Sequence, residues 1–405
     1  MWHWIRRWRD WAVNERLPLH RVRSQAQPMH CSYEKAGLTL PHSPVPWNAD
    51  AVLVEATLRL PPPARRKADY TLRIDGGPPV VAEQLRRGEA RDDTHRLSFR
   101  IPTPAATCTA RLFWKQHLLG ETVVPILTAD AFLRDLELAS PTLFVRLGDQ
   151  MVAASTFVAT QCRGLTATAV VRSKTHLAAL ADLGLRVEFR SDRTGTVEEV
   201  SIPLTSSQLA AREVLVSASP RKVPRRLGAW SATWKVGDKV LGVSRAKGIS
   251  QRTFAASLRV SDTRFVVETR TGSHLSRQAP PHGEAQRVGP AFLIASREAG
   301  MAGLCDLRVV AQVAGAVAPP LLQEKTLLIT DGPTLFAPGT LDAGELEQLI
   351  SFELRLGKLL LGLLPLHPVP EATFNSEGGF KPPPAFAWSP LADDELTERL
   401  GKLMG

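Results

Sequence analysis

Apolar and polar residues alternate along many short stretches of this chain. Ala51 to Leu60, Tyr70 to Ile74 and Arg96 to Ile101 each carry an apolar residue at every second position. A period of two predicts half-buried β-strands, because successive side chains of a strand point to opposite faces of the sheet. Residues that favour turns separate such stretches, as at Asp75-Gly76-Gly77 and Gly237-Asp238.

Helical periodicity is scarce and short in the body of the chain. Thr175 to Leu183 and Asp342 to Ile350 each have the length of two or so helical turns. We therefore expect a mostly β protein whose internal helices are brief and lie within loops.

Two short motifs recur three times in the same order, which indicates internal repetition. A Leu-Gly pair is followed each time, twelve residues beyond its glycine, by a phenylalanine; the pairs are Leu119-Gly120, Leu241-Gly242 and Leu361-Gly362, and the phenylalanines are Phe132, Phe254 and Phe374. Upstream of each pair a Leu-Arg-Ile/Val triplet follows closely on an aspartate; the triplets begin at Leu72, Leu185 and Leu307. Two anchors in a constant order predict three related units.

The Leu-Gly segment is best defined in the second unit. There Ala229 to Val236 and Lys239 to Val243 flank the Gly237-Asp238 turn. The segment Trp-Lys-x-Gly-x-x-x-Leu-Gly, from Trp234 to Gly242, resembles the last hairpin of bacterial immunoglobulin-like domains. In those domains an aromatic strand, a tight turn and a Leu-Gly strand close the sandwich. The resemblance implies fold only and carries no catalytic residue, and the disulfide with its packed tryptophan of antibody domains is missing.

The fold expected from pattern and resemblance is three tandem immunoglobulin-like β-sandwich repeats with short amphipathic helices at both termini. We place the units at residues 28–138, 139–260 and 261–380. A Trp/Arg-rich amphipathic segment, residues 1–27, precedes them, and a linker with an acidic amphipathic helix, residues 381–405, follows.

Both termini have a helical stripe that needs a partner. At the start, Trp4, Trp8 and Trp11 fall on one face of a helix, with arginines turned mostly away. This face has three possible positions: in a protein partner's groove, on a membrane surface, or folded back on the first unit. At the end, a second stripe consists of Leu396, Leu400 and Leu403. It predicts either a tethered docking helix or a helix packed on its own domain.

Composition places the chain among globular proteins. Of its 405 residues 44% are hydrophobic and 22% charged. The sequence contains neither a run of roughly 18 apolar residues nor a signal-peptide pattern, so we expect a cytoplasmic protein. The cysteines are far apart and form no Cys-x-x-Cys pair, which favours neither disulfides nor a zinc site; they are Cys31, Cys108, Cys162 and Cys305.

The net charge of +10 has two interpretations, an acidic partner or the Arg-rich composition of a GC-rich genome. The best candidate for nucleic-acid binding is a basic cluster followed by Trp230 and Trp234; its members are Arg221, Lys222, Arg225 and Arg226. Clustered cations attract phosphates and aromatic rings can stack on bases. The competing interpretation is a loop entering the late hairpin, with both tryptophans in the core.

Motifs of the easily recognised enzymes are missing from the sequence, including phosphate-binding glycine loops, His-Glu-x-x-His and the Gly-x-Ser-x-Gly elbow. The nearest carboxylate and histidine cluster, Asp92-Asp93 with His95, falls in the charged stretch Arg86 to Arg96 and is interpreted as a solvated loop. No catalytic residue, cofactor or metal is therefore expected.

The leading hypothesis is a non-enzymatic scaffold or adaptor. Its sandwich loops, edge strands and terminal helices would bind protein partners as a subunit of a larger bacterial complex. The alternative is a nucleic-acid-binding accessory subunit that uses the basic cluster of the second unit. A third hypothesis is a divergent hydrolase with its site between units.

Overall fold

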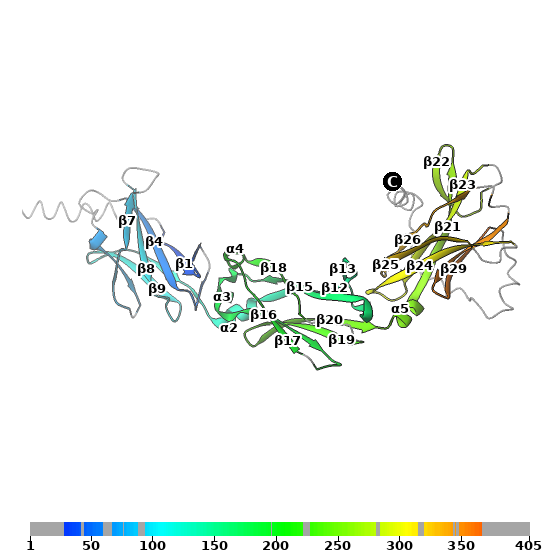
Figure 1. Ribbon diagram of the computed structural model, residues 1–405. Helices are drawn as coiled ribbons and strands as arrows, with labels where there is room; N and C mark the ends of the chain where they lie inside the picture. The colour runs from blue at the N-terminus through cyan, green and yellow to red at the C-terminus, as the bar shows by residue number, and fades with distance from the viewer. Residues whose placement is uncertain are drawn as a thin grey trace, which may run out of the picture.

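The computed structural model describes residues 28–41, 44–59, 67–75, 77–87, 94–195, 197–221, 227–280, 284–314, 320–342, 345 and 348–366. The described strands form six sheets around three large hydrophobic cores. They group into three lobes that follow one another along an open arc (Figure 1). The predicted mostly β fold class is confirmed.

The first lobe contains two main sheets and a short parallel pair. One sheet has the order β2 (Leu38–Pro41), β1 (His30–Lys35), β4 (Ala51–Arg59), β8 (Thr94–Ile101) and β7 (Gln84–Arg87). The other has the order β10 (His117–Val124), β9 (Cys108–Trp114), β5 (Tyr70–Ile74) and β6 (Val80–Val81), with η2 (Lys67–Asp69) before β5. Strands β3 (Val45–Pro46) and β11 (Ile126–Leu127) pair in parallel.

The second lobe repeats this plan. One sheet has the order β13 (Gln150–Ala153), β12 (Glu137–Leu147), β15 (Cys162–Arg172) and β18 (Glu213–Ala218). The other has the order β17 (Val197–Ile202), β16 (Leu185–Ser191), β19 (Gly228–Val236), β20 (Lys239–Ile249) and β14 (Thr156–Val158). Short helices fill its loops: α2 (Ala129–Asp135), η3 (Ala159–Gln161), η4 (Leu177–Ala179), α3 (Leu180–Leu183) and α4 (Ser206–Ala210).

The third lobe follows helix α5 (Gln251–Ser257). One sheet has the order β22 (Gly272–Ser276), β21 (Leu258–Thr269), β23 (Arg287–Ser296) and β26 (Thr334–Phe336), and β27 (Leu341–Asp342) also pairs with β23. The other strands are β25 (Leu321–Ile329), β24 (Met301–Val313), β28 (Leu349–Leu356) and β29 (Leu359–Pro365), and they pair in that order.

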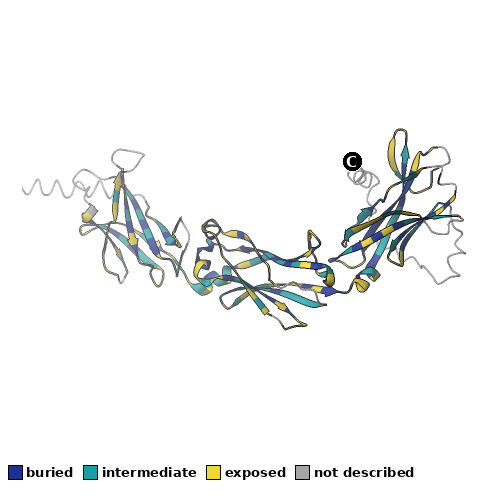
Figure 2. Cartoon of the chain, in the orientation of Figure 1, coloured by how far each residue is buried: buried dark blue, intermediate teal, exposed yellow. Residues whose placement is uncertain are grey.

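The alternation of the sequence places one face of each strand in a core. In β16, Leu185, Val187 and Phe189 are buried, whereas the charged residues between them, Arg186 and Glu188, are more exposed. Figure 2 shows the same banding of buried and exposed residues along strands of all three lobes. Burial of these apolar side chains is the main favourable contribution to the fold.

The three predicted Leu-Gly segments all form the second strand of a hairpin: β9–β10, β19–β20 and β28–β29. The turn position after the first strand has a positive φ each time, 52° at Lys115, 54° at Gly237 and 59° at Gly357. Glycine adopts this conformation without a steric cost. The first hairpin makes the same turn with Lys115 in place of glycine, at the cost of a left-handed conformation for a residue with a side chain.

In each hairpin the leucine of the Leu-Gly pair is the extra residue of a β-bulge. The register shifts at Leu119, Leu241 and Leu361, and the following glycine returns to the ladder. The upstream triplets lie on β5, β16 and β24, which pair with β9, β19 and β28. The three lobes therefore share the strand order of this sheet.

The predicted alignment of the first triplet is wrong by two residues. Leu72 lies opposite Leu112 of the hairpin, in the position that Val187 occupies opposite Trp234 in the second lobe. Tyr70, not Leu72, therefore corresponds to Leu185. The sequence match missed this because alternating strands look alike when they are shifted by two residues.

Two of the three recurring phenylalanines lie on the helix that begins the next lobe. Phe132 on α2 and Phe254 on α5 are fully buried in the cores of the second and third lobes, whereas Phe374 lies outside the described residues. Each helix starts at a side-chain cap: Thr128 accepts a hydrogen bond from the Ala131 amide, and Ser250 accepts one from the Thr253 amide.

The predicted helix at 175–183 is present as η4 and α3. The ends of the predicted helix at 342–350 are wrong, because Asp342 belongs to β27 and β28 begins at Leu349. Between the two strands, the described residues Glu345 and Gln348 have 3₁₀-helical conformation, as the expected short helical turns require. The unit boundaries drawn from the anchors stay predictions.

Candidate interaction surfaces

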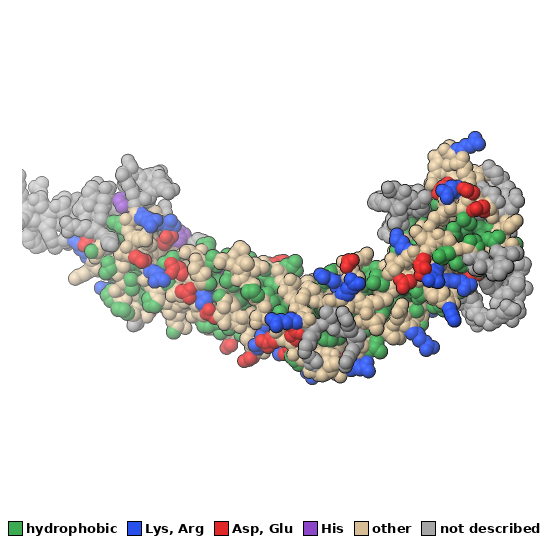
Figure 3. All heavy atoms as spheres, in the orientation of Figure 1, with side chains coloured by type: hydrophobic (Ala, Val, Ile, Leu, Met, Phe, Trp, Pro, Cys, Tyr) green, Lys and Arg blue, Asp and Glu red, His purple; other side chains and the backbone are tan. Residues whose placement is uncertain are grey.

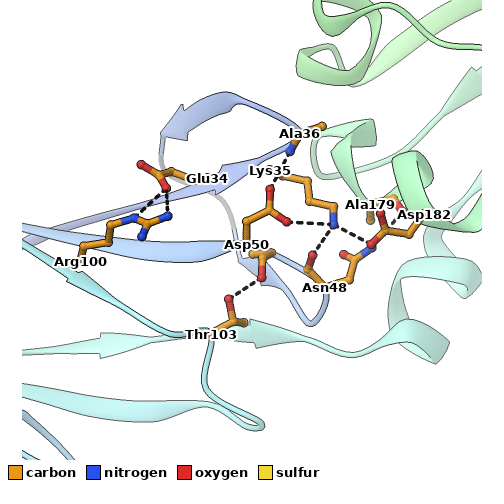
Figure 4. A network of polar contacts seen from close by, with 10 residues as sticks. Glu34, Lys35, Ala36, Asn48, Asp50, Arg100, Thr103, Ala179 and Asp182 are labelled. Carbon is orange, nitrogen blue, oxygen red and sulfur yellow. Dashed lines mark hydrogen bonds and ion pairs between the residues drawn. The ribbon is translucent and has the colours of Figure 1, made fainter.

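The first and second lobes meet around a buried lysine. Lys35 Nζ lies 2.6 Å from Asp182 Oδ2, 2.5 Å from the Asn48 carbonyl oxygen and 3.4 Å from Asp50 Oδ1 (Figure 4). Its side chain is only 5% exposed. An ammonium group removed from water needs such partners, and Asp182 comes from the second lobe. Asp50 of the first lobe also faces the ammonium group, but the closer carboxylate, that of Asp182, reaches it only when the two lobes are in this relation.

Other contacts reinforce this first junction. The Asn48 amide donates to the Ala179 carbonyl at 3.2 Å and to Asp182 Oδ2 at 3.0 Å. Ala178 of the second lobe belongs to the core of the first lobe. In the other direction, the ring of Trp47 lies 6.0 Å from that of Phe132, centre to centre. Polar and apolar contacts together fix the angle between the lobes.

The second junction is a strand shared by two lobes. Strand β14 pairs in parallel with β20 of the second lobe and with β24 of the third. Phe157 is opposite Gly248 on one side and Ala302 on the other. One continuous sheet therefore passes from the second lobe into the third.

Side chains extend that backbone pairing. The Gln161 amide donates to the Leu304 carbonyl and accepts from the Leu304 N–H, each at 2.8 Å. The Ser155 and Thr156 amides donate to the Gly300 carbonyl at 2.9 and 3.0 Å. Gly303 of β24 leaves room for Val158 of β14, whose Cγ2 lies 2.7 Å from the position that a Cβ would take. Backbone pairing, side-chain hydrogen bonds and apolar packing thus hold β14 against the third lobe.

The second lobe has an open side between the edges of its two sheets. A groove of about 570 Å³ runs beside β17 and the residues after β18, lined by Val197, Glu198, Glu199, Ser219 and Arg221 among others. A second groove of about 630 Å³ lies near the other end of β17 and is mostly apolar; Leu183, Ile202, Leu204 and Leu209 line it. Unpaired strand edges beside grooves are sites where proteins bind extended segments.

Arg221 is the one member of the predicted basic cluster that the structure describes. It is exposed, and its backbone N–H donates to the Glu198 carboxylate at 2.6 Å, which brings a negative charge to the site. Trp234 is fully buried and Trp230 packs against the same core, so neither ring is placed to stack on bases. The interpretation that these tryptophans fill the core is confirmed.

The remaining sequence-predicted site residues lie outside the described residues; they are Trp4, Trp8, Trp11, Lys222, Arg225, Arg226, Leu396, Leu400 and Leu403. On the face shown in Figure 3, acidic and basic side chains of the described part are interspersed. That face carries no broad patch of one sign.

Burial favours the protonated form of three cysteine thiols and of the Tyr33 hydroxyl. Burial raises the pKa of Cys305 from 9.0 to about 12 and that of Tyr33 from 10.0 to about 12. Burial also raises the pKa of Cys31 and Cys108, so none of these three thiols is an activated nucleophile. The described residues, which include all four cysteines, contain no disulfide.

Clusters of catalytic or metal-binding type were also sought in the described part. Within it, no group of three or more His, Cys, Asp or Glu side chains is arranged to hold a metal ion. Asp92 and Asp93 lie outside the described residues. The predicted solvated loop at His95 is wrong. His95 is buried on β8, at a position where the alternation of that strand points inward. No helix among the described residues is long and apolar enough to span a membrane.

No protein-family model matches the sequence, and no curated protein sequence matches it. Among solved structures, the chain is similar to domains 4–9 of surface layer protein SbsC, with 12% identity, a TM-score of 0.29, and coverage of 84% of this chain and 47% of that one. It thus spans about half of that S-layer fragment. The Escherichia coli adhesin FdeC is 11% identical with a TM-score of 0.25, covering 84% of this chain and 98% of that one.

A third similar structure is the I9–I11 tandem from titin, at 8% identity and a TM-score of 0.22, covering 77% of this chain and 90% of that one. All three TM-scores lie below 0.5, and the resemblance to immunoglobulin-like β-sandwich domains stays a prediction from the sequence. These likenesses concern the fold alone, and the strand orders described above define it for this chain.

Proposed function

We propose that this chain is a non-enzymatic scaffold of three tandem immunoglobulin-like repeats that holds protein partners at a fixed spacing. The carrying observation is the construction of both junctions. The first places the Lys35 ammonium group on Asp182 of the next lobe, and the second passes one sheet from lobe to lobe through β14. Flexible strings of domains need no such contacts, whereas a scaffold depends on them to keep its binding surfaces at set distances and angles.

Partners of such a scaffold would bind the sandwich loops and unpaired edges, above all on the open side of the second lobe. The terminal stripes at Trp4, Trp8 and Trp11 and at Leu396, Leu400 and Leu403 are part of this proposal. So are membership of a larger bacterial complex and a cytoplasmic location. A membrane-surface contact by the N-terminal stripe is the competing use of that segment.

A charge reversal at the first junction tests the proposal. Asp182→Lys sets a second ammonium group against Lys35 and should loosen the contact between the first two lobes. Asp149→Lys is the matched control, because Asp149 has the same charge and its side chain is fully exposed in the same lobe. Spin labels on the two lobes report their distance distribution, and quantitative affinity capture from the source cells reports the partners.

We expect Asp182→Lys to broaden the distance distribution and to lose partners that contact both lobes, while Asp149→Lys changes neither. Unchanged partner recovery despite a broadened distribution would show that the fixed geometry serves no scaffold function.

The nucleic-acid alternative has one supporting feature, the exposed Arg221 beside the groove along β17. The buried Trp234 and the carboxylate of Glu198 count against it. Its test is the affinity for single-stranded DNA as a function of salt, with and without Arg221→Ala. Phosphate contacts would give a steep decline with salt, reduced in the variant; absence of binding at low salt would end this alternative.

A further inference from the structure

Several edge strands carry residues that disfavour pairing with another chain, either a charged residue on the inner face of the sheet or a proline. On β17 the charged residue Glu198 lies opposite the buried Phe189 and therefore on the inner face of its sheet. On β25, Lys325 lies opposite the buried Leu307 in the same way. In the first lobe, β2 ends in Pro41. Inward charges and prolines are known protections of free edges.

Strand β18, with the sequence EVLVSA, has neither an inward-facing charge nor a proline. It contains no proline, and its register with β15 runs without a bulge from Glu213 to Ala218. Its inner face is entirely apolar, with Val214 and Val216 buried. On its outer face Leu215 is 68% exposed, more than any other large apolar residue described. Within the described residues, β18 pairs only with β15, so its second edge is open.

We propose that β18 pairs antiparallel with β18 of a second copy of this chain, about a two-fold axis at Leu215. The two sheets that contain β18 would then join into one eight-stranded sheet with β15 and β15 of the second copy on either side. This inference goes beyond the proposed scaffold function and does not rest on it.

The position of the axis follows from the two faces of the strand. Opposed residues of an antiparallel pair point to the same face. A two-fold axis between identical strands must therefore set one residue opposite the same residue of the second copy. At Leu215 it sets leucine against leucine, Val214 against Val216, and Glu213 against Ser217. No like charges are opposed, and the inner faces of both sheets remain apolar.

Neighbouring axes fit less well. An axis at Val216 sets Leu215 against Ser217, and an axis at Val214 sets Leu215 against the charged Glu213. Only the axis at Leu215 covers the most exposed apolar side chain with its own copy. Leu215 is opposite Val170, and Val170 is opposite Ala139. This apolar stripe crosses the outer face, and the two-fold axis makes it continuous between the copies.

The first experiment measures self-association by sedimentation equilibrium up to about 100 µM chain, a range that detects the micromolar affinities of small interfaces. Leu215→Arg places like charges on the axis and should weaken the dimer at least about tenfold. Val197→Arg is the matched control, since Val197 is 52% exposed on the outer face of the other edge strand, β17. Thermal unfolding checks that both variants fold.

We expect the unmodified chain and Val197→Arg to dimerise equally, and the dimer dissociation constant of Leu215→Arg to be at least about tenfold higher. A monomeric unmodified chain over the whole range would overturn the proposal, even if the chain captured a different protein. A dimer that Leu215→Arg leaves intact would overturn it as well.

The second experiment tests the register by cysteine crosslinking in a Cys31→Ser, Cys108→Ser background. In Leu215→Cys the two introduced thiols face each other on the axis, and oxidised glutathione takes up the two electrons as the disulfide forms. In Ser217→Cys the thiols lie about 13 Å apart along the strands, four residues of about 3.3 Å each. We expect a covalent dimer from the first variant only; faster crosslinking of the second would overturn the register.

Discussion

The side-chain amide of Gln161 forms two hydrogen bonds with the backbone of Leu304, one as donor and one as acceptor. It thereby acts as one further residue of the ladder in which β14 pairs with β24. The two residues are 143 positions apart in the sequence and belong to different lobes. The Gln161 side chain thus adds two hydrogen bonds to the contact between the second and third lobes.

Replacement of Gln161 should weaken the second junction. Gln161→Leu leaves the partly buried Leu304 N–H and carbonyl without their partners, and each lost hydrogen bond should cost about 0.5–1.5 kcal/mol. Urea unfolding monitored by probes in the second and third lobes measures the loss. Gln150→Leu, on the exposed start of β13, is the control and should change stability little. Equal effects of the two changes would contradict the role of Gln161.

A methyl group at Gly303 should disturb the core of the third lobe and its packing against β14. The added Cβ would lie 2.6 Å from the Phe254 ring and 2.7 Å from Val158 Cγ2. Overpacking of this kind typically costs about 1–3 kcal/mol. Gly120→Ala is the control, since no described atom lies within 4 Å of its Cβ position. Calorimetry should show a lower melting temperature for Gly303→Ala than for Gly120→Ala.

The hairpin turns should differ in their tolerance of side chains. Gly237→Lys and Gly357→Lys force a side chain into the left-handed region, at a cost of about 1–2 kcal/mol each. Both Cβ positions have open space, so the cost is conformational. Lys115→Gly relieves the same strain but loses the contact of Lys115 Nζ with the Trp114 ring, at 5.1 Å. Chemical unfolding should therefore show a smaller change for Lys115→Gly.

Stability should fall at alkaline pH, partly because of Cys305. Burial raises its pKa from 9.0 to about 12, so above pH 9 the unfolded chain loses a proton that the folded chain keeps. The stabilising contribution is complete below pH 9 and declines as the pH rises toward 12. Unfolding free energies at pH 8 and pH 10.5 should differ less in Cys305→Ala than in the unmodified chain. An equal decline in both would contradict the assignment.

Much of the fold was predictable because its signals are local. Alternation in β16 and the Gly237 turn each report on a few neighbouring residues, so the strands and the hairpins emerged from the sequence. The two-residue error at Leu72 and the buried position of His95 show the limit of such signals. A strand pattern gives the face of a residue but not its partner in the sheet.

The sequence by itself determined the strand-rich fold, the recurring hairpins and the order of the repeated motifs, because period and turn chemistry act over short distances. Only the tertiary structure decided how the lobes are joined and which edges stay open. Lys35 meets Asp182 across 147 residues, and β14 selects β24 as well as β20. Such choices depend on burial, charge compensation and backbone pairing between distant segments, which leave no periodic mark in the sequence. The candidate surface on β18 also depends on the tertiary structure, because only the order of strands in the sheet shows that β18 lies at its edge.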